Sequence, residues 1–493
     1  MRSWTDAASP TPLPDRLILA GGLLVDGSGA APRQADLLMV GGRISAIGDR
    51  RDMPAGVPVL DVTGRIVAPG FIDSHTHDDG YLLVHRDMTP KVSQGITTVV
   101  TGNCGISLAP LVRGTVPQPL DLLGPPALFH FASFKAWLDA LRAAPAAVNV
   151  VPLVGHTTLR VAVMDDTGRA ASAPEVARMQ ALLAEALDAG AFGMSTGTFY
   201  PPAAHATTQE IIDVGAPMRT HGGLYATHLR DEADLIVPAM EEALEIGRAL
   251  DCLVVFSHHK LAGGSNHGRS HETMALIDRA ARLQPVCLDC HPYPATSTML
   301  RLDRVRISRR TLITWSTGLP SAQGRDFADM QAELGLDDVQ TLERLAPAGA
   351  IYFLMDEADV ERIMSHPLAM VGSDGLPFDP HPHPRQWGTF TRVLRTLVRE
   401  RAVLPIEAAI HKMTGLAARH YGLPDRGLLR IGYRADVVVF DPAAVTDLAT
   451  FEQPVQASEG VEGVWVNGQR VWDGQRATGA LPGEVLSRAK RGG

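Results

Sequence analysis

A chain of 493 residues is too long for one small hydrophobic core, although length does not separate two ordinary domains from one large barrel with an appendage. The composition, 20% charged and 45% hydrophobic, is that of a globular protein, and no run of about 18 apolar residues offers a transmembrane helix. The net charge of −9 argues against a nucleic-acid surface, which needs clustered Lys and Arg, and favours a small-molecule substrate.

The four cysteines, at positions 104, 252, 287 and 290, do not resemble a disulfide framework in so long a chain. No helix signal follows Cys287-x-x-Cys290, as it would in a redox motif. Residues 1–14 contain several prolines and no apolar core of signal-peptide length. We therefore expect a cytoplasmic protein with no membrane partner.

Short strand-like runs, separated by paired glycines, fill residues 16–66. Similar runs return near the C-terminus, where Asn467-Gly468 is a strong hairpin turn. We predict that the two ends of the chain complete one small β-sandwich domain, built from residues 1–66 and 420–480.

Between these ends, strands alternate with amphipathic helices. In one helix Ser172 is the expected N-cap, Glu175 completes a capping box, and Gly190 ends the apolar face. The short strand 191–195 follows. A second unit repeats the pattern, with a helix from about 232 to 249 before the next strand.

This alternation is typical of a parallel sheet with crossover helices, which makes the fold α/β. Several such units in about 350 residues favour a TIM-like (β/α)8 barrel over an open sheet. We predict the barrel over residues 67–419. An arginine-rich segment at about 296–349 does not fit the alternation and indicates an insertion over one end.

The chain is organised around the apolar run 66–72, which is followed by His75 and His77. On an extended strand the i, i+2 spacing places two imidazoles on the same face, where both can reach one metal ion. Two surface histidines after a strand are the alternative, so other metal-type residues must be found downstream.

Such residues follow each of several predicted strands. In a barrel all strand ends converge on the C-terminal face, where active sites are built. A chance arrangement would have to occur five times, so we predict a metal site there. The residues are His75 and His77 after 66–72, Cys104 after 95–101, His228 after 223–227, His258 after 253–257 and Asp374 after 368–373.

Five motifs contain these residues and follow one another along the chain. They are Gly70-Phe71-Ile72-Asp73-Ser74-His75-Thr76-His77-Asp78-Asp79, Gly102-Asn103-Cys104-Gly105, Thr227-His228-Leu229-Arg230-Asp231-Glu232, Ser257-His258-His259-Lys260 and Gly372-Ser373-Asp374-Gly375-Leu376-Pro377. HxH alone is a weak signal, whereas five motifs in this order are specific. On these motifs the sequence resembles, over nearly its whole length, the amidohydrolase superfamily, and within it the zinc-dependent N-acyl-D-amino acid deacylases, or D-aminoacylases. Segments 314–317 and 345–353 resemble the N-acyl-D-glutamate deacylase branch.

The resemblance implies one tight Zn²⁺ and a neighbouring, weaker metal position. A thiolate with two imidazoles suits Zn²⁺ and leaves a place for a water, whose pKa the ion lowers towards ~7. Asp374 would accept the proton of that water and pass it to the leaving amine. Cys104 as an ordinary buried thiol is the alternative. The implied ligands are Cys104, His228 and His258 for the tight ion, and His75, His77 and Asp374 for the second.

A product amino acid carries a carboxylate, for which the family uses a lysine and an arginine at the positions of Lys260 and Arg385. Simple solvent-exposed charge is the alternative for each. Where relatives read Asp-x-Tyr-Pro-Tyr, this chain keeps Tyr293 but has His291 for the first tyrosine, a substrate contact. Histidine also donates a hydrogen bond, more strongly if protonated, so we expect it to contact the substrate with a different pH dependence.

Arg304 matches the position at which the D-glutamate branch places a cation for the acidic side chain. Other arginines of the insertion are candidates by proximity only, and a solvated face on a lid is the alternative for most of them. They are Arg301, Arg306, Arg309 and Arg310.

The leading hypothesis is therefore zinc-dependent hydrolysis of N-acyl-D-amino acids to a carboxylate and the free D-amino acid, with acidic side chains such as D-glutamate included. The alternative activity is cleavage of dipeptides with a C-terminal D-residue or of a cyclic amide. A third hypothesis is a binding or assembly protein on the same fold, against which the retention of all six ligand-type residues speaks. Oligomeric state and metal count are not readable from the sequence.

Overall fold

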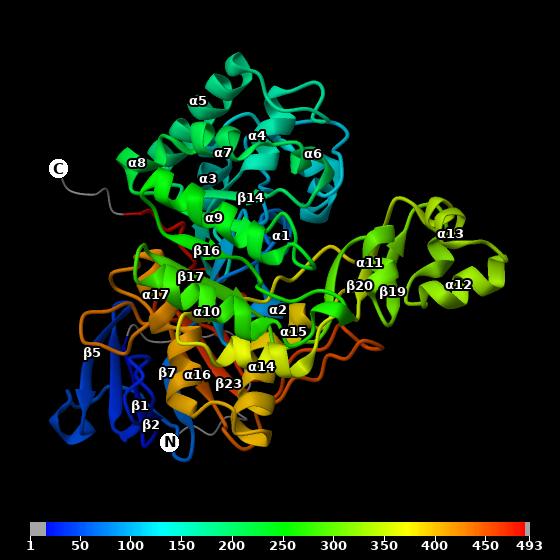
Figure 1. Ribbon diagram of the computed structural model, residues 1–493. Coiled ribbons are helices and arrows are strands. Elements are labelled where there is room, and N and C mark those ends of the chain that lie inside the picture. Colours follow the sequence, from blue (N-terminus) through cyan, green and yellow to red (C-terminus); the bar gives the residue numbers. More distant parts are fainter. Residues whose placement is uncertain (1–15, 489–493) are drawn as a thin grey trace.

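The protein is described by a computed structural model that covers residues 16–488, so the expectation about residues 1–14 lies outside the described part. Parallel strands occupy the centre of the molecule (Figure 1). They form a three-stranded sheet ordered β12-β9-β8 and a six-stranded sheet ordered β13-β14-β15-β16-β17-β21. The bounds are β8 Phe71–Asp73, β9 Ile96–Thr101, β12 Asn149–Pro152, β13 Val154–Gly155, β14 Gly193–Gly197, β15 Leu224–His228, β16 Val254–Phe256, β17 Val286–Cys290 and β21 Ala369–Val371.

The two sheets are joined by backbone contacts. β12 and β13 are consecutive, and the N–H of Leu153 between them donates to the carbonyl of Thr101 (3.0 Å). At the other side Ser74, just beyond β8, donates to the carbonyl of Val371 in β21 (3.2 Å), and Thr76 bridges to Gly375. The fold is α/β, as predicted.

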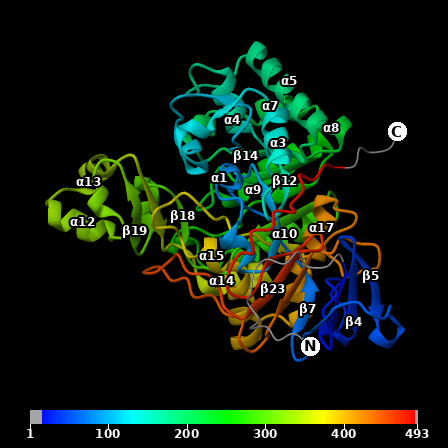
Figure 2. The same cartoon turned by 180° about the vertical axis from the view of Figure 1, so that it is seen from behind.

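Helices lie on both sides of these strands in both views (Figures 1 and 2). The helix predicted after Ser172 is confirmed as α5, with the capping box to Glu175 and with Gly190 at φ 119° as its C-cap. Its apolar face is buried because three- and four-residue spacing places those side chains on one side. The bounds are α3 Phe134–Ala143, α4 His156–Val163, α5 Ala173–Ala189, α7 Thr208–Gly215, α9 Ile236–Leu250, α10 Ser270–Ala281, α14 Glu357–Ser365, α15 Arg385–Arg392, α16 Ile406–Met413 and α17 Gly415–Tyr421.

The second predicted helix begins four residues later than expected. It starts at Ile236 instead of about Glu232, because the Asp231 carboxylate accepts the backbone N–H groups of Ala233 (2.7 Å) and Leu235 (3.1 Å). Those bonds offer the backbone an alternative to the helix. Glu232 consequently lies on a loop, free to enter the site described below.

The predicted strand 66–72 is two strands in two different sheets. Gly70 separates β7, Ile66–Pro69, from β8, and its N–H donates to the carbonyl of Asp436 (2.8 Å). The N–H of the next residue, Phe71, donates instead to Gly95 in the parallel region (2.9 Å). The change of partner between adjacent residues breaks the strand.

Strands from both ends of the chain pair with each other. β22 lies between β7 and β23, and the predicted hairpin is confirmed with Asn467 at φ 49° and Gly468 at φ 80°. The six-stranded sheet that contains β7 and β22 shares an apolar cluster with a four-stranded sheet that contains β1 and β4. The cluster includes Leu19, Met39 and Trp465. The sheets are β5-β4-β1-β6 and β24-β23-β22-β7-β2-β3, with β1 Arg16–Ala20, β2 Leu23–Leu24, β3 Arg33–Gln34, β4 Asp36–Val40, β5 Arg43–Gly48, β6 Val59–Asp61, β22 Val437–Phe440, β23 Val461–Val466 and β24 Gln469–Trp472.

The arginine-rich segment forms a lobe that projects to one side of the molecule (Figure 1). Its antiparallel sheet, ordered β18-β20-β19, is inserted in the sequence between the paired parallel strands β17 and β21. Within the described residues, no helix is both long and apolar enough to cross a membrane. The bounds are β18 Thr296–Met299, α11 Leu302–Ile307, β19 Thr311–Ser316, α12 Phe327–Leu334, α13 Asp338–Leu345 and β20 Ala348–Tyr352.

The junction at Gly70 generates a prediction about stability. A Cβ at Gly70 would lie 2.2 Å from Cγ2 of the buried Thr97, so Gly70→Ala should lower the free energy of unfolding by about 1–3 kcal/mol. Gly48→Ala is the control, since a Cβ there meets no described atom within 4 Å. Urea unfolding midpoints measure both, and equal midpoints would contradict the steric argument.

Candidate active site

The metal-type side chains lie where parallel strands end. His228 is the last residue of β15, and the others follow their strands within a few residues. Cys104, His258 and Asp374 all have left-handed backbone conformations, with φ of 53°, 35° and 51°. Such a conformation costs a residue other than glycine about 1–3 kcal/mol and persists only where the surroundings fix it, which is a common property of functional sites.

Four of these side chains converge on one point. One ligand atom from each of His75, Cys104, His258 and Asp374 lies within 4.8 Å of the others. The Cys104 sulfur is 3.2 Å from Nε2 of His75 and 3.2 Å from Nε2 of His258. His77 adjoins the group, with its Nε2 3.2 Å from Oδ1 of Asp374.

A second group lies beside the first and shares His258 with it. His228, Glu232 and His258 offer ligand atoms within 4.8 Å of one another. The structure therefore brings Cys104 and His258 together, and places His228 in the neighbouring group. Both ring nitrogens of the buried His228 lack a hydrogen-bond partner among the described residues.

The chemistry of this donor set fits Zn²⁺. A thiol, imidazoles and a carboxylate are all Zn²⁺ ligands, and buried imidazole nitrogens without a hydrogen bond, as in His228, are costly unless something binds them. Burial lowers the pKa of His75 to about 3 and that of His228 well below its ordinary value, so both are neutral and able to ligate. Burial also raises the pKa of the Cys104 thiol, which a bound cation would oppose.

Asp374 is held as a carboxylate. Burial alone would raise its pKa, but the positive charge of Arg385 and the neighbouring histidines hold it well below the ordinary value. The Arg385 guanidinium lies 2.9 Å from Oδ2 of Asp374. An ionised carboxylate beside the metal-type cluster can act as a base.

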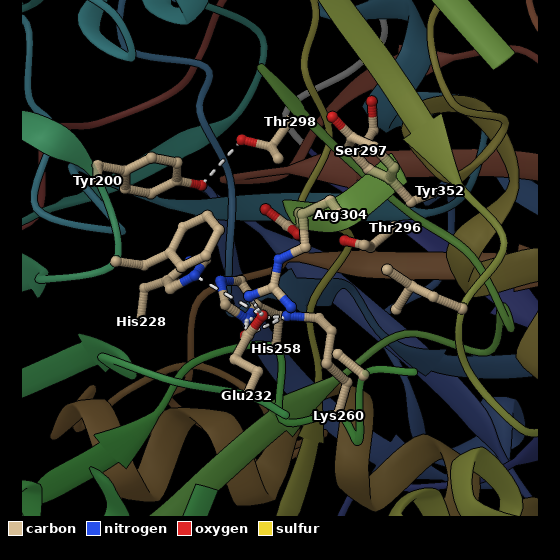
Figure 3. Close-up of a pocket in the computed structure, with 14 residues that line it drawn as sticks. Tyr200, His228, Glu232, His258, Lys260, Thr296, Ser297, Thr298, Arg304 and Tyr352 are labelled. Atoms are coloured by element: carbon tan, nitrogen blue, oxygen red, sulfur yellow. Dashed lines mark hydrogen bonds and ion pairs between the residues drawn. The ribbon is translucent and has the colours of Figure 1, made fainter. Parts of the chain in front are cut away.

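A pocket lies beside the two groups (Figure 3). Lys260 and Arg304 line it and are only 2% and 6% exposed, so neither is a solvated surface charge. The Phe199 ring lies between functional side chains, with the Arg304 guanidinium 4.3 Å from its centroid and the His228 ring stacked at 5.2 Å. The Tyr200 hydroxyl is 3.0 Å from Oγ1 of Thr298, which connects the central strands to the lobe.

The remaining predicted substrate residues lie next to this pocket. Arg385 is fully buried and contacts Nε2 of His291 (3.2 Å) as well as Asp374. Burial and then the charge of Arg385 hold the pKa of His291 well below its ordinary value, so His291 is a neutral imidazole, not the protonated donor. Tyr293 packs against His383, with ring centroids 5.0 Å apart. None of Arg385, His291 and Tyr293 is among the described residues that line the pocket.

Of the five arginines proposed at the insertion, Arg304 alone lines the pocket in the described part of the chain. Arg306, Arg309 and Arg310 are exposed on the lobe, whereas Arg301 is half-buried, with its guanidinium 4.2 Å from the ring centroid of Phe199, a residue that lines the pocket. Arg301 pairs with Asp303, Arg306 with Asp338 and Arg310 with Asp326, and Arg309 is exposed.

Sequence reasoning missed two buried carboxylates. Glu232 contacts Lys260 and His258. The sequence signal for Glu232 was its position four residues after His228, at the end of the motif that begins at Thr227. Asp289 accepts the backbone N–H of His258 (2.7 Å) from the end of β17, and burial raises its pKa to about 7. The signal for Asp289 in the sequence is its place at the end of an apolar run, like the polar residues after the other strands.

The chain is similar to known proteins over nearly its whole length. The model of the Amidohydrolase family matches residues 58–252 and 253–472. The chain is 71% identical to the N-acyl-D-aspartate deacylase of Alcaligenes xylosoxydans xylosoxydans, covering 95% of this chain and 94% of the relative.

Two solved structures are similar along the whole chain. A D-aminoacylase, described as having a binuclear metal centre with one-metal activation and second-metal attenuation, is 56% identical with a TM-score of 0.95, over 96% of this chain and 100% of that one. The N-acyl-D-glutamate deacylase of Bordetella bronchiseptica, complexed with zinc and a phosphonate inhibitor, is 46% identical with a TM-score of 0.91, over 96% and 99%.

The convergence on Cys104 predicts the effect of removing its thiol. Cys104→Ala should weaken Zn²⁺ binding by more than about 100-fold, since loss of even an outer partner of a ligand costs 10–100-fold. Competition with a chelating dye measures the affinity. Cys252→Ala, at a buried cysteine that precedes β16, should bind Zn²⁺ like the wild type, and equal affinity of the two variants would exclude Cys104 as a ligand.

Proposed function

This chain is a member of the amidohydrolase family, and from that premise we propose that it hydrolyses N-acyl-D-amino acids with acidic side chains, D-aspartate in preference to D-glutamate. The products are a carboxylate and the free D-amino acid. The observation that carries the proposal is the pocket, in which the buried cations Lys260 and Arg304 lie beside the metal-type cluster. The higher identity to the D-aspartate deacylase, 71% against 46% to the D-glutamate enzyme, supports the shorter side chain.

We assign Zn²⁺ as the cofactor, with one tight and one weaker position. Zn²⁺, when bound, polarises the amide carbonyl and makes water acidic enough to attack at neutral pH. Cys104 and His258, whose sulfur and Nε2 atoms are 3.2 Å apart, support the tight position. The proposed ligands are Cys104, His228 and His258 for the tight ion and His75, His77 and Asp374 for the weaker one.

The chain's own residues then bind the substrate and move the proton. Asp374 accepts the proton of the attacking water and delivers it to the departing nitrogen, which is otherwise a poor leaving group. Arg385 keeps Asp374 ionised and oriented through the 2.9 Å contact. Lys260 and Arg385 bind the α-carboxylate, Arg304 binds the side-chain carboxylate, and His291 donates from a neutral ring, with Tyr293 packed behind it.

We further propose that the parallel strands close as a (β/α)8 barrel over residues 67–419. The contacts of Ser74 with Val371 and of Thr76 with Gly375 support closure between the first and last of these strands. The paired strands of the two chain ends support a separate β-sandwich domain from residues 1–66 and 420–480, of which the described residues begin at 16.

The experiment that tests the activity is a substrate screen. Purified, Zn²⁺-analysed protein is offered N-acetyl and N-formyl D- and L-amino acids, dipeptides ending in a D-residue, and a cyclic amide. We expect N-acetyl-D-aspartate to have the highest kcat/KM. Preference for a D-terminal dipeptide or for a ring substrate would replace the proposed activity, and no hydrolysis at all would favour a binding protein.

The proposed role of Asp374 predicts the effect of removing its charge. Asp374→Asn should lower kcat by about 10²–10⁴-fold, the usual contribution of a positioned base. Zn²⁺ content is measured on the same preparation. Asp359→Asn, at a buried carboxylate that contacts Ser270, is the control and should keep most activity. Near-normal turnover of a Zn²⁺-loaded Asp374→Asn variant would refute the assignment.

The proposed role of Arg304 predicts a change in specificity. Arg304→Ala should lower kcat/KM for N-acetyl-D-aspartate by about 10- to 100-fold, the loss expected for a charged hydrogen bond. N-acetyl-D-leucine, which has no second carboxylate, should lose far less. Arg306→Ala, on the exposed side of the same helix, is the matched control. An equal loss for both substrates would exclude the side-chain role.

A further inference from the structure

Glu232 contacts both halves of the site, the proposed metal ligands and the proposed substrate cations (Figure 3). Its Oε1 is 2.5 Å from Nζ of Lys260 and 3.2 Å from Nδ1 of His258. Its Oε2 is 3.8 Å from the Arg304 guanidinium and 3.7 Å from Nε2 of His228. The residue is only 5% exposed, so these contacts cannot be exchanged for water at little cost.

Two groups compete for one nitrogen of His258. Nζ of Lys260 is 2.6 Å from Nδ1 of His258, and the Glu232 carboxylate is 3.2 Å from the same atom. The other nitrogen, Nε2, faces the Cys104 sulfur. An imidazole that binds a metal through Nε2 carries its proton on Nδ1 and needs an acceptor there. Glu232 is an acceptor, whereas the Lys260 ammonium has only donors.

We propose that Glu232 couples substrate binding to Zn²⁺ binding by exchanging Lys260 for His258. When the α-carboxylate of a substrate draws Lys260 away, Nδ1 of His258 is left to donate to Glu232 alone, which orients the ring for the metal. Conversely, a metal on Nε2 repels Lys260 from Nδ1 and releases it towards the substrate. The inference rests on the proposed function, since it takes the substrate to be an N-acyl-D-amino acid.

Coupling of this kind is reciprocal. If the ligand tightens Zn²⁺ binding by some factor, Zn²⁺ tightens ligand binding by the same factor, and typical couplings are about 5- to 150-fold. D-Aspartate, the product of the proposed reaction, is a suitable probe because it carries the carboxylates and is not turned over. Glu232 is thus a positioning residue, and its effect appears in an equilibrium measured without catalysis.

The test is the Zn²⁺ affinity of the full-length protein with and without D-aspartate, determined by chelator competition and corrected for Zn²⁺ binding by D-aspartate in a protein-free blank. For the wild type we expect D-aspartate to tighten Zn²⁺ binding at least fivefold. In Glu232→Gln the effect should fall below twofold. Glu242→Gln is the matched control, because Glu242 also pairs with a basic residue, Arg230, but outside the pocket, and it should keep the wild-type coupling.

Lys260→Met provides a test of opposite sign. Removing the competitor of Glu232 should tighten Zn²⁺ binding at least fivefold without any ligand. Arg304→Met is the control for the loss of a positive charge. If that loss alone tightened Zn²⁺ binding, Arg304→Met would tighten it as much as Lys260→Met. We expect Arg304→Met to change Zn²⁺ affinity less than twofold. Tightening in both variants, or weakening in Lys260→Met, would overturn the proposed exchange.

The outcome is separable from that of the proposed function. Hydrolysis of N-acetyl-D-aspartate is followed on the same preparations. An active enzyme that binds D-aspartate while its Zn²⁺ affinity stays unchanged, or a Glu232→Gln variant with full coupling, would refute the inference alone. A protein that neither hydrolyses N-acyl-D-amino acids nor binds D-aspartate would refute the proposed function, and the inference with it.

Discussion

The arrangement of the whole site depends on how His258 is held. Its backbone is in the left-handed region, its N–H is bound by Asp289, its Nε2 faces Cys104 and its Nδ1 faces Glu232. Each contact comes from a different strand end, and each partner is buried, so the ring has little freedom to turn. Because His258 belongs to both groups of metal-type residues, a change in its orientation alters the metal position and the substrate pocket together.

A buried ionic network gives the same rigidity to the opposite side of the site. Lys91 is fully buried and donates to Asp73 (3.0 Å) and to the hydroxyl of Ser373 (3.0 Å), while Asp73 also accepts the backbone N–H of Ser373 (2.7 Å). Asp73 lies two residues before His75, and Ser373 immediately precedes Asp374. Buried ion pairs add little net stability, but removing one partner leaves an uncompensated charge. The network therefore fixes the relative positions of the strand ends β8 and β21 more than it stabilises the fold.

The sequence predicted the features that follow from local patterns. The capping box at Ser172, the turn at Asn467-Gly468 and the polar residues after successive strands all depend on nearest neighbours, and the structure has them. The break at Gly70 and the late start of α9 were missed, because each depends on a hydrogen bond that competes with the regular pattern. Glu232 was missed as a site residue for the same reason, since a helix would have carried it outward. The grouping of His228 apart from Cys104 depends on side-chain directions that spacing does not define.

The proposed reacting groups and the proposed specificity residue belong to different parts of the fold. The metal-type residues and Asp374 belong to the ends of the parallel strands, whereas Arg304 and one wall of the pocket belong to the lobe. Side chains that span the boundary join the two parts: Tyr200 contacts Thr298, and Arg385 contacts both Asp374 and Thr296. With the proposed roles, a lobe that changes in sequence alters the side chain that is accepted without disturbing the reacting groups. Glu232 is the exception, because its one carboxylate contacts the metal-type histidines as well as Lys260 and Arg304, the proposed substrate cations. The proposed coupling therefore links selectivity to metal binding at this residue.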